Sequence, residues 1–180
     1  MHQKSIKLKF IHVQLTSLVV ILIFLIFVLL PYMFINNNEE GNILKLDVNY
    51  GTIILAVIFG IFIHELLHGM GWVFFTKRGI KSIKLGIAWK LLTPYCYCSE
   101  KLKLKHYIIG AFLPVLLQGI LPSILAIITG SKILLHFSFF FLIAASGDLL
   151  LIYKLSKFSF DCWVKDDINN FGCDIFTNEY

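Results

Sequence analysis

Charged residues are scarce in this sequence. Only 15% of its 180 residues are Asp, Glu, Lys or Arg, whereas 58% are hydrophobic, and the mean hydropathy is +0.80. This composition excludes an ordinary soluble globular domain, in which about 25% of residues are charged. Internal repeats and low-complexity regions are also missing. We therefore expect a single domain, residues 1–180, that is integral to a lipid bilayer.

Four apolar segments are each long enough for a helix that crosses a bilayer, which needs about 20 residues. They are residues 15–35, 52–76, 107–128 and 133–155. The first segment follows basic residues, as a secretory signal does, but it is longer than a typical signal core and no small-residue cleavage site follows it. The sequence therefore predicts an all-α integral membrane protein with about four transmembrane helices and a tail, residues 156–180.

The positions of the basic residues predict an orientation. Of sixteen Lys and Arg, three precede the first segment, eight lie between Lys77 and Lys105, and three lie from Lys154 onward. Because cytoplasmic loops are enriched in Lys and Arg, we expect both termini and the loop 77–106 in the cytoplasm of a multi-pass cell-membrane protein. These lysines flank the spans and accompany no recognition motif, so nothing predicts nucleic-acid binding.

The four cysteines form no recognised metal-binding pattern. Cys96 and Cys98 form a CxC pair, and all four thiols fall in the expected cytoplasmic regions, where disulfides do not persist. A second metal site made by Cys96, Cys98 and His106 would have an unusual spacing. We expect small, partly buried thiols instead.

An HExxH motif, His64-Glu65-Leu66-Leu67-His68, lies inside the second apolar segment. In a helix the two imidazoles, four residues apart, project from one face, with Glu65 beside them to activate a metal-bound water. This pattern is typical of a zinc-dependent hydrolase. The alternative is a structural cluster of hydrogen-bonded side chains, but ionisable groups at bilayer depth cost several kcal/mol unless they pair or bind something.

A second carboxylate, Asp148, lies in the fourth apolar segment. Glu65 and Asp148 are the only two of the eleven acidic residues within the predicted spans, and no Lys or Arg accompanies them. A bound metal cation would supply the missing counter-charge. Asp148 and His68 lie about seven and eight residues from the cytoplasmic ends of their helices, roughly 10 to 12 Å at 1.5 Å per residue, so they can meet at one level. A capping or packing carboxylate is the alternative.

These residues predict one catalytic Zn²⁺ per chain. His64, His68 and Asp148 would be its ligands, with water in the fourth position, which is the arrangement of an open catalytic zinc site. Glu65 would act as the general base toward that water and would pass the proton to the leaving amine. Fe or Co can occupy similar His and carboxylate sites.

The same residues carry a resemblance to a known family. The stretch HELLHGMGW (64–72), the segment Thr93–Cys98 followed by Tyr107, and Ser146-Gly147-Asp148-Leu149 resemble a family of small bacterial membrane proteins described as zincin peptidases. The chain is more distantly similar to site-2 protease type intramembrane metalloproteases, which share an HExxH on one helix and an Asp ligand on a later one. In that class the Asp lies in an Asn-Pro-Asp-Gly context, which this chain does not have. The resemblance implies a metal-dependent peptidase fold.

Two further regions predict how a substrate is held. Residues 80–106 alternate partly between apolar and polar side chains, which predicts a small cytoplasmic β-hairpin between the second and third helices. An exposed strand edge there would hold an extended substrate by main-chain hydrogen bonds; alternatively, the hairpin lies on lipid headgroups. Proline within the third helix, as at Pro114, frees a backbone carbonyl and kinks the axis. Gln118 beside it is a candidate substrate-binding residue, or else it bridges two helices.

We therefore predict a membrane-embedded metalloprotease that hydrolyses a peptide bond in or near the membrane. Its expected partners are the lipid bilayer and a membrane-associated protein or peptide substrate, and the oligomeric state stays open. A non-catalytic zinc-binding partner, such as an immunity or assembly protein, is one alternative. A transporter is another, although a single site away from the midplane argues against it. The tail, with its aromatic and acidic residues, is expected to pack as an amphipathic segment on the membrane surface or on the loop.

Overall fold

The computed structural model describes residues 2–36, 43, 46, 48–88, 93–167 and 172–177, which are mostly helical. The helices are α1 (Phe10–Phe24), a π-helical turn (Leu25–Leu29), α2 (Leu30–Ile35), α3 (Tyr50–Val73), a 3₁₀ turn (Gly79–Ser82), α4 (Leu104–Pro114), a π-helical turn η3 (Val115–Ile120), α5 (Leu121–Thr129), α6 (Lys132–Ala144) and α7 (Ser146–Leu155). The strands are β1 (His2–Lys7), β2 (Ile83–Ala88), β3 (Thr93–Cys98), β4 (Leu102–Lys103), β5 (Trp163–Asp167) and β6 (Gly172–Thr177).

Three of the helices are long and apolar enough to cross a membrane: Phe10–Ile35, Tyr50–Val73 and Leu104–Thr129. The pair α6 and α7 passes the same test as one span, with a bend of 49° between its two parts. All four lie within about five residues of the segments expected from hydrophobicity. Large apolar side chains cover their outer faces, as on Ile58 and Ile128. This surface suits contact with lipid.

The fourth predicted helix, residues 133–155, is not straight. It is divided at Ala145, which is fully buried and follows the end of α6. The Ser146 hydroxyl donates to the Ile143 carbonyl and accepts from the Ser17 hydroxyl, so a side chain takes the place of regular backbone bonding. Such local side-chain bonds bend helices. As a result α7 starts inside the helical bundle and not at its end.

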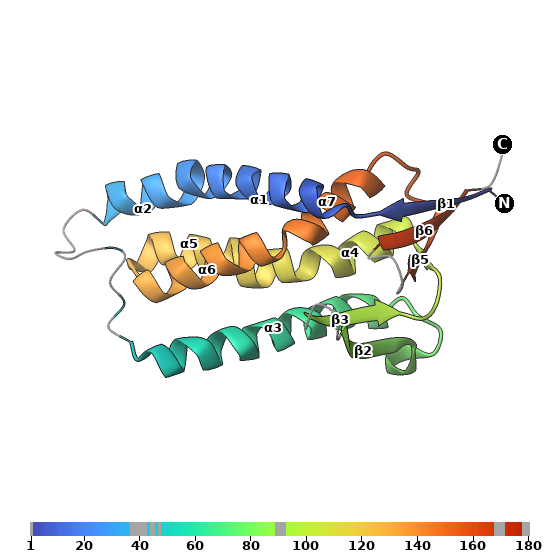
Figure 1. Ribbon diagram of the computed structural model, residues 1–180, viewed down its shortest axis with the longest axis horizontal. Helices are drawn as coiled ribbons and strands as arrows, with labels where there is room; N and C mark the ends of the chain where they lie inside the picture. Colours follow the sequence, from blue (N-terminus) through green and yellow to red (C-terminus); the bar gives the residue numbers. More distant parts are fainter. Residues whose placement is uncertain are drawn as a thin grey trace.

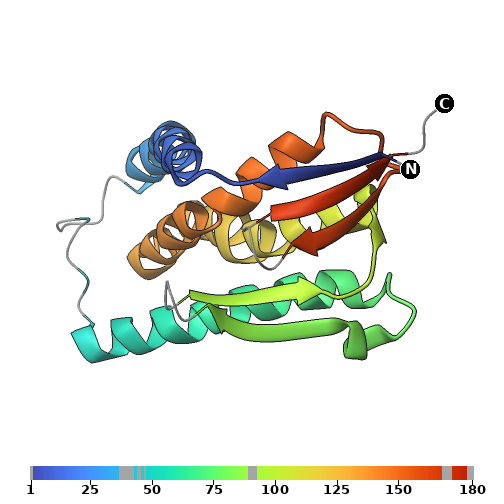
Figure 2. The same ribbon diagram turned by 45° about the vertical axis from the view of Figure 1, so that its right-hand side comes forward.

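The hairpin expected between the second and third helices is confirmed. Strands β2 and β3 pair antiparallel, with Leu85 opposite Cys96, and its turn, residues 89–92, lies outside the described residues. The hairpin runs alongside the C-terminal half of α3 (Figures 1 and 2). Gly69 of α3 allows this contact, because a Cβ there would come within 2.8 Å of the Ile83 side chain.

A second sheet, which the sequence did not predict, adds strands to the mostly helical fold. Strands β1, β6, β5 and β4 form a four-stranded antiparallel sheet in that order. The tail alternates in this sheet: Val164, Cys173 and Ile175 are buried while their neighbours are less so. Period-two burial is the pattern of a strand with one covered face. The tail is therefore part of a sheet at the end of the bundle.

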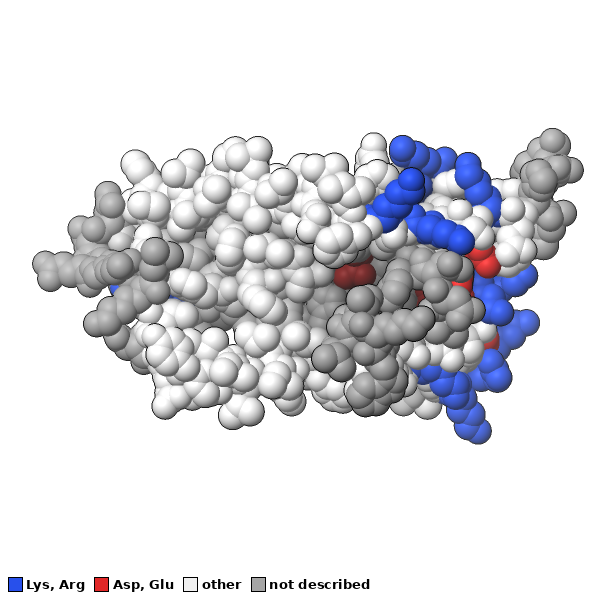
Figure 3. Space-filling view, viewed as in Figure 1, with Lys and Arg blue, Asp and Glu red and all other residues white. Residues whose placement is uncertain are grey.

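The first and last described strands, β1 and β6, lie together at this sheet end of the bundle (Figure 1). Strand β1 precedes the first long helix and pairs with β6, which follows the last. If these helices cross a bilayer, the number of crossings is therefore even, and α6 with α7 forms the fourth. Lys and Arg gather at the sheet end, whereas uncharged residues cover most of the rest of the visible face (Figure 3). This distribution fits the predicted cytoplasmic placement of both termini, which stays a prediction.

Candidate metal centre

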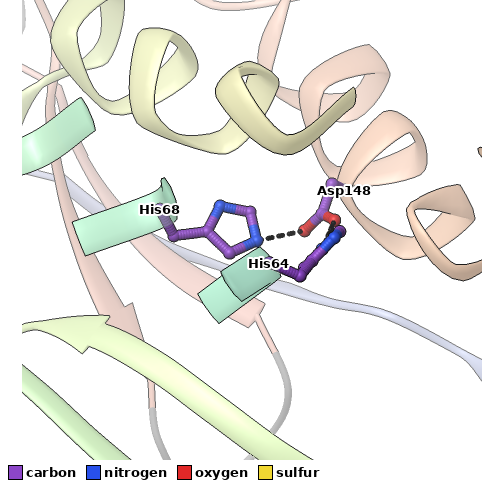
Figure 4. A group of neighbouring side chains, drawn as sticks. All are labelled: His64, His68 and Asp148. Carbon is purple, nitrogen blue, oxygen red and sulfur yellow. Dashed lines mark hydrogen bonds and ion pairs between the residues drawn. The ribbon is translucent and has the colours of Figure 1, made fainter. Parts of the chain in front are cut away.

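Three side chains predicted as ligands lie together in the bundle. The ligand atoms of His64, His68 and Asp148 all lie within 4.8 Å of one another. His64 Nε2 is 3.2 Å from Asp148 Oδ2, and His68 Nε2 is 3.5 Å from Asp148 Oδ1 (Figure 4). Both histidines are buried, and the Asp148 side chain is 23% exposed. Within the described residues this is the only such group of His, Cys, Asp and Glu side chains.

The crossing of α3 and α4 fixes the two histidines. At Gly71 an added Cβ would lie 2.4 Å from the Gly110 Cα, so the two helix backbones are nearly in contact. Small residues permit such close approach of membrane helices. Trp72 then stacks between His68 and Tyr107 and donates its indole N–H to the Tyr107 carbonyl. This stack holds the face of α3 that carries the histidines against α4.

The bend before α7 supplies the carboxylate. Asp148 lies in the first turn of α7, where the helix dipole and free N–H groups favour negative charge. A straight helix through Ala145 would give no helix terminus at this depth. The break of the fourth span therefore places Asp148 beside the histidines.

The donor set fits a zinc ion. Two imidazole nitrogens and a carboxylate oxygen are a ligand set found at catalytic zinc sites, and they leave a fourth position open. The described part of the chain brings no Lys or Arg to the cavity beside them. The gathered acceptor atoms of His64, His68 and Asp148 would therefore be matched by a cation.

Glu65 lies beside the group and lines the same cavity. This cavity has a volume of about 820 Å³ and is bounded by α3, α4, α7, β3 and the C-terminal sheet. The backbone amide of Cys96 in β3 hydrogen-bonds the Glu65 carboxylate. Figure 3 shows acidic atoms recessed below the surface, next to the rim of basic side chains. The cavity thus joins the candidate metal ligands to a carboxylate suited to proton transfer.

Gln118 does not line this cavity. Its side-chain Oε1 lies 3.1 Å from His64 Nδ1, and its Nε2 donates to the Gly60 carbonyl at 2.9 Å. Both polar groups of this buried side chain are therefore engaged with α3. This geometry favours the helix-bridging interpretation of Gln118 over the predicted substrate contact.

The cysteines do not form a second metal group with His106 in the described residues. His106 stacks on Phe75, whereas Cys98 is buried in the core below the sheet. Burial raises the pKa of the Cys96 thiol to about 12 and that of the Cys98 thiol to about 11. Both remain protonated at neutral pH, as structural thiols do.

Two carboxylates at the cavity, Asp166 and Asp167, were not among the predicted site residues. Asp166 of β5 accepts hydrogen bonds from the Cys98 backbone N–H and the Tyr107 hydroxyl. Burial raises its pKa to about 6. Asp166 ties the C-terminal sheet to β3 and α4. The alternation of apolar and polar residues in the tail could have predicted strand β5, but it could not have predicted the hydrogen-bond partners of Asp166.

The comparisons with known proteins agree with this site. Residues 57–163 match the model of the family described as "Putative zincin peptidase". No curated protein and no solved structure gives a significant match. The matched region covers more than half of the chain and contains the HExxH motif, Gln118 and Asp148. The protein therefore belongs to this zincin peptidase family.

Proposed function

We propose that the protein is a zinc metalloprotease that hydrolyses a peptide bond in or near a membrane. The observation that carries the proposal is the meeting of His64, His68 and Asp148 beside Glu65 in one cavity of an apolar helical bundle. The zincin family match supports the same chemistry.

The proposed mechanism divides the work between two groups of side chains. His64, His68 and Asp148 hold one zinc ion, which when bound lowers the pKa of water and polarises a carbonyl. Glu65 removes a proton from the attacking water and delivers it to the nitrogen of the leaving amine. The hydrogen bond from the Cys96 amide holds the Glu65 carboxylate at the cavity wall between these two transfers.

The lining of the cavity supports a membrane-associated polypeptide as the substrate. Phe10 and Val13 at the start of the first long helix form one side, and Pro94 to Tyr97 of β3 form another. An extended substrate segment would lie along Pro94–Tyr97. The outer edge of β3 is not open along its whole length, because the Cys98 N–H already donates to Asp166. Two more backbone donors of β3 are taken or missing, because the Cys96 N–H bonds Glu65 and Pro94 has no N–H. The proposed contact of a substrate with β3 is therefore through the side chains of Pro94–Tyr97 that line the cavity.

Comparison of wild type with Glu65→Gln in membranes tests this proposal. New peptide termini would be mapped by mass spectrometry in cells that make either form at equal levels. The proposal predicts termini that depend on wild type and are lost with Glu65→Gln, while both forms retain zinc. An identical set of termini from the two forms, both loaded with zinc, would refute it.

A further inference from the structure

Each histidine of the metal centre makes a hydrogen bond through the ring nitrogen that points away from Asp148. His68 Nδ1 lies 3.0 Å from the Gly110 carbonyl oxygen, and His64 Nδ1 lies 3.1 Å from Gln118 Oε1. Both acceptors belong to the third long helix, Leu104–Thr129. Both contacts are made where that helix departs from regular α-helical bonding, at Pro114 and in the π-helical turn that follows it.

The Gly110 carbonyl is available because of Pro114. In an α-helix the carbonyl of residue 110 accepts from the N–H of residue 114, and proline has no N–H. Pro114 lies inside α4, so the Gly110 oxygen has no regular helical donor. The His68 ring nitrogen donates to it instead. The close crossing at Gly71 brings α3 near enough for this bond.

The orientation of the Gln118 amide follows from its second partner. The Gly60 carbonyl can only accept, so the NH₂ group of Gln118 must face it, and Oε1 must face His64. His64 Nδ1 is therefore the protonated nitrogen. Gln118 lies in the π-helical turn η3 that directly follows Pro114. Turns of this kind inside α-helices occur frequently at functional sites.

Both imidazoles are thus held in the same tautomer. With Nδ1 protonated on each ring, both Nε2 atoms carry a free lone pair. Both of these nitrogens lie beside the Asp148 carboxylate, where the metal ion would bind. Metal-binding histidines commonly donate their other N–H to a carbonyl or carboxylate, which fixes the ring and raises its basicity. Here the acceptor for His68 is the Gly110 backbone carbonyl, and the acceptor for His64 is the side-chain carbonyl of Gln118.

We propose that residues 110–118 of the third helix are the positioning segment of the metal centre: the carbonyl freed by Pro114 and the Gln118 side chain set the tautomers of His68 and His64. Gln118 and Pro114 are positioning residues, because they act through the histidines. This inference rests on the proposed zinc site and adds to it the group that orients each imidazole.

The first test uses Pro114→Ala in the full-length, detergent-solubilised protein. Alanine restores an N–H that competes for the Gly110 carbonyl, so the Kd for zinc, measured by competition with a chelator, should rise about 10- to 100-fold. The melting temperature of the zinc-free protein should not fall, since an interior proline itself destabilises a helix. Pro31→Ala is the matched control, because Pro31 also lies inside a long apolar helix but belongs to the first one, Phe10–Ile35, and not to the helix that bonds His64 and His68. Its Kd should equal that of wild type.

The second test replaces the Gln118 acceptor. Gln118→Met keeps the approximate volume and removes the acceptor, so the Kd for zinc should again rise about 10- to 100-fold. Gln118→Glu keeps an oxygen toward His64 and should restore affinity to within a few-fold. The absorption spectrum of bound Co²⁺ should change in Gln118→Met and return toward wild type in Gln118→Glu, because it reports ligand geometry.

The outcomes separate this inference from the proposed function. If wild type binds zinc and both Pro114→Ala and Gln118→Met bind it equally tightly, the positioning role is overturned and the zinc site stands. If wild type binds no zinc, both are overturned. Weakened binding in these two variants, with unchanged binding in Pro31→Ala and rescue by Gln118→Glu, supports the inference.

Discussion

Glu100 and Asp148 are both acidic residues with several close partners, but the partners differ in kind. Glu100 accepts from the backbone N–H groups of Lys77 and Arg78, from the Arg78 guanidinium and from the Ser82 hydroxyl. Each of these groups is a fixed donor. In the described residues, the partners of the Asp148 carboxylate are two imidazole Nε2 atoms.

The difference shows that the protein supplies hydrogen-bond donors to the Glu100 carboxylate, whereas the Asp148 carboxylate has room for a cation. The donors around Glu100 hold the 77–82 loop to the end of β3, which is a structural task. Around Asp148, the proposed tautomers direct the Nδ1 protons of both histidines to Gly110 and Gln118, and the Nε2 atoms are then acceptors like the carboxylate itself. Acceptors that converge without a donor call for a positive ion.

The largest expected difference between Asp148 and Glu100 is in the affinity for zinc. Asp148→Ala should raise the Kd for zinc about 10³-fold, because four-ligand zinc sites bind with roughly 10 to 16 kcal/mol and one ligand is lost. Glu100→Gln should leave the Kd unchanged. Chelator competition on both purified variants measures this. Equal loss of affinity in the two variants would mean that zinc binding depends on global folding and not on Asp148.

Zinc should stabilise the fold only when Asp148 is present. At a free zinc concentration 100-fold above its Kd, wild type should gain about 2.7 kcal/mol of unfolding free energy. Asp148→Ala should gain almost none at the same concentration, whereas Glu100→Gln should gain as much as wild type. Thermal unfolding in detergent with and without zinc checks this. A full gain in Asp148→Ala would place the ion elsewhere.

Asp166 should give a pH dependence opposite to that of Glu100. Burial raises the Asp166 pKa from an ordinary 3.8 to about 6, so the folded state holds a proton that the unfolded state has lost. Its contribution to stability is present below pH 3.8 and is lost as the pH rises through about 6. Asp166→Asn should therefore remove part of the decline in stability between these values. Urea unfolding midpoints measured over a pH series check this. If the midpoint falls with pH as steeply in Asp166→Asn as in wild type, the prediction is contradicted.

Glu100 should produce the smallest effect, since it is partly exposed to solvent. Hydrogen bonds from Ser82, the Lys77 amide and Arg78 lower its pKa from 4.5 to about 2. The folded state thus binds the proton less readily than the unfolded state, and stability from Glu100 is present above pH 4.5 and is lost as the pH falls toward 2. Glu100→Gln should reduce this acid-induced loss. The same urea series, extended to low pH, measures it.

The sequence predicted the parts of the site that depend on local spacing. His64 and His68 share a helix face because they are four residues apart, and Glu65 follows directly. Asp148 could be found because an unpaired carboxylate in an apolar helix needs a partner. Hydrophobic length likewise located the four spans to within a few residues. These features follow from short-range geometry and from the cost of burying charge.

The remaining features depend on contacts between distant parts of the chain. Ser5 pairs with Asp174 across 169 residues, so no local pattern shows that the N-terminal segment and the tail share a sheet. The bend at Ala145 depends partly on Ser17 of another helix. The sequence shows that Pro114 frees a carbonyl, but only the packing of α3 on α4 shows that His68 uses it.

Metal content tests the central claim most directly. Elemental analysis of the purified, detergent-solubilised protein would compare wild type with His64→Ala and Glu65→Gln. The zinc-protease proposal predicts about one zinc ion per chain in wild type and in Glu65→Gln, and almost none in His64→Ala. A wild type that carries no metal and cannot be reconstituted with zinc would contradict it, and the HExxH helix would then be a packing feature only.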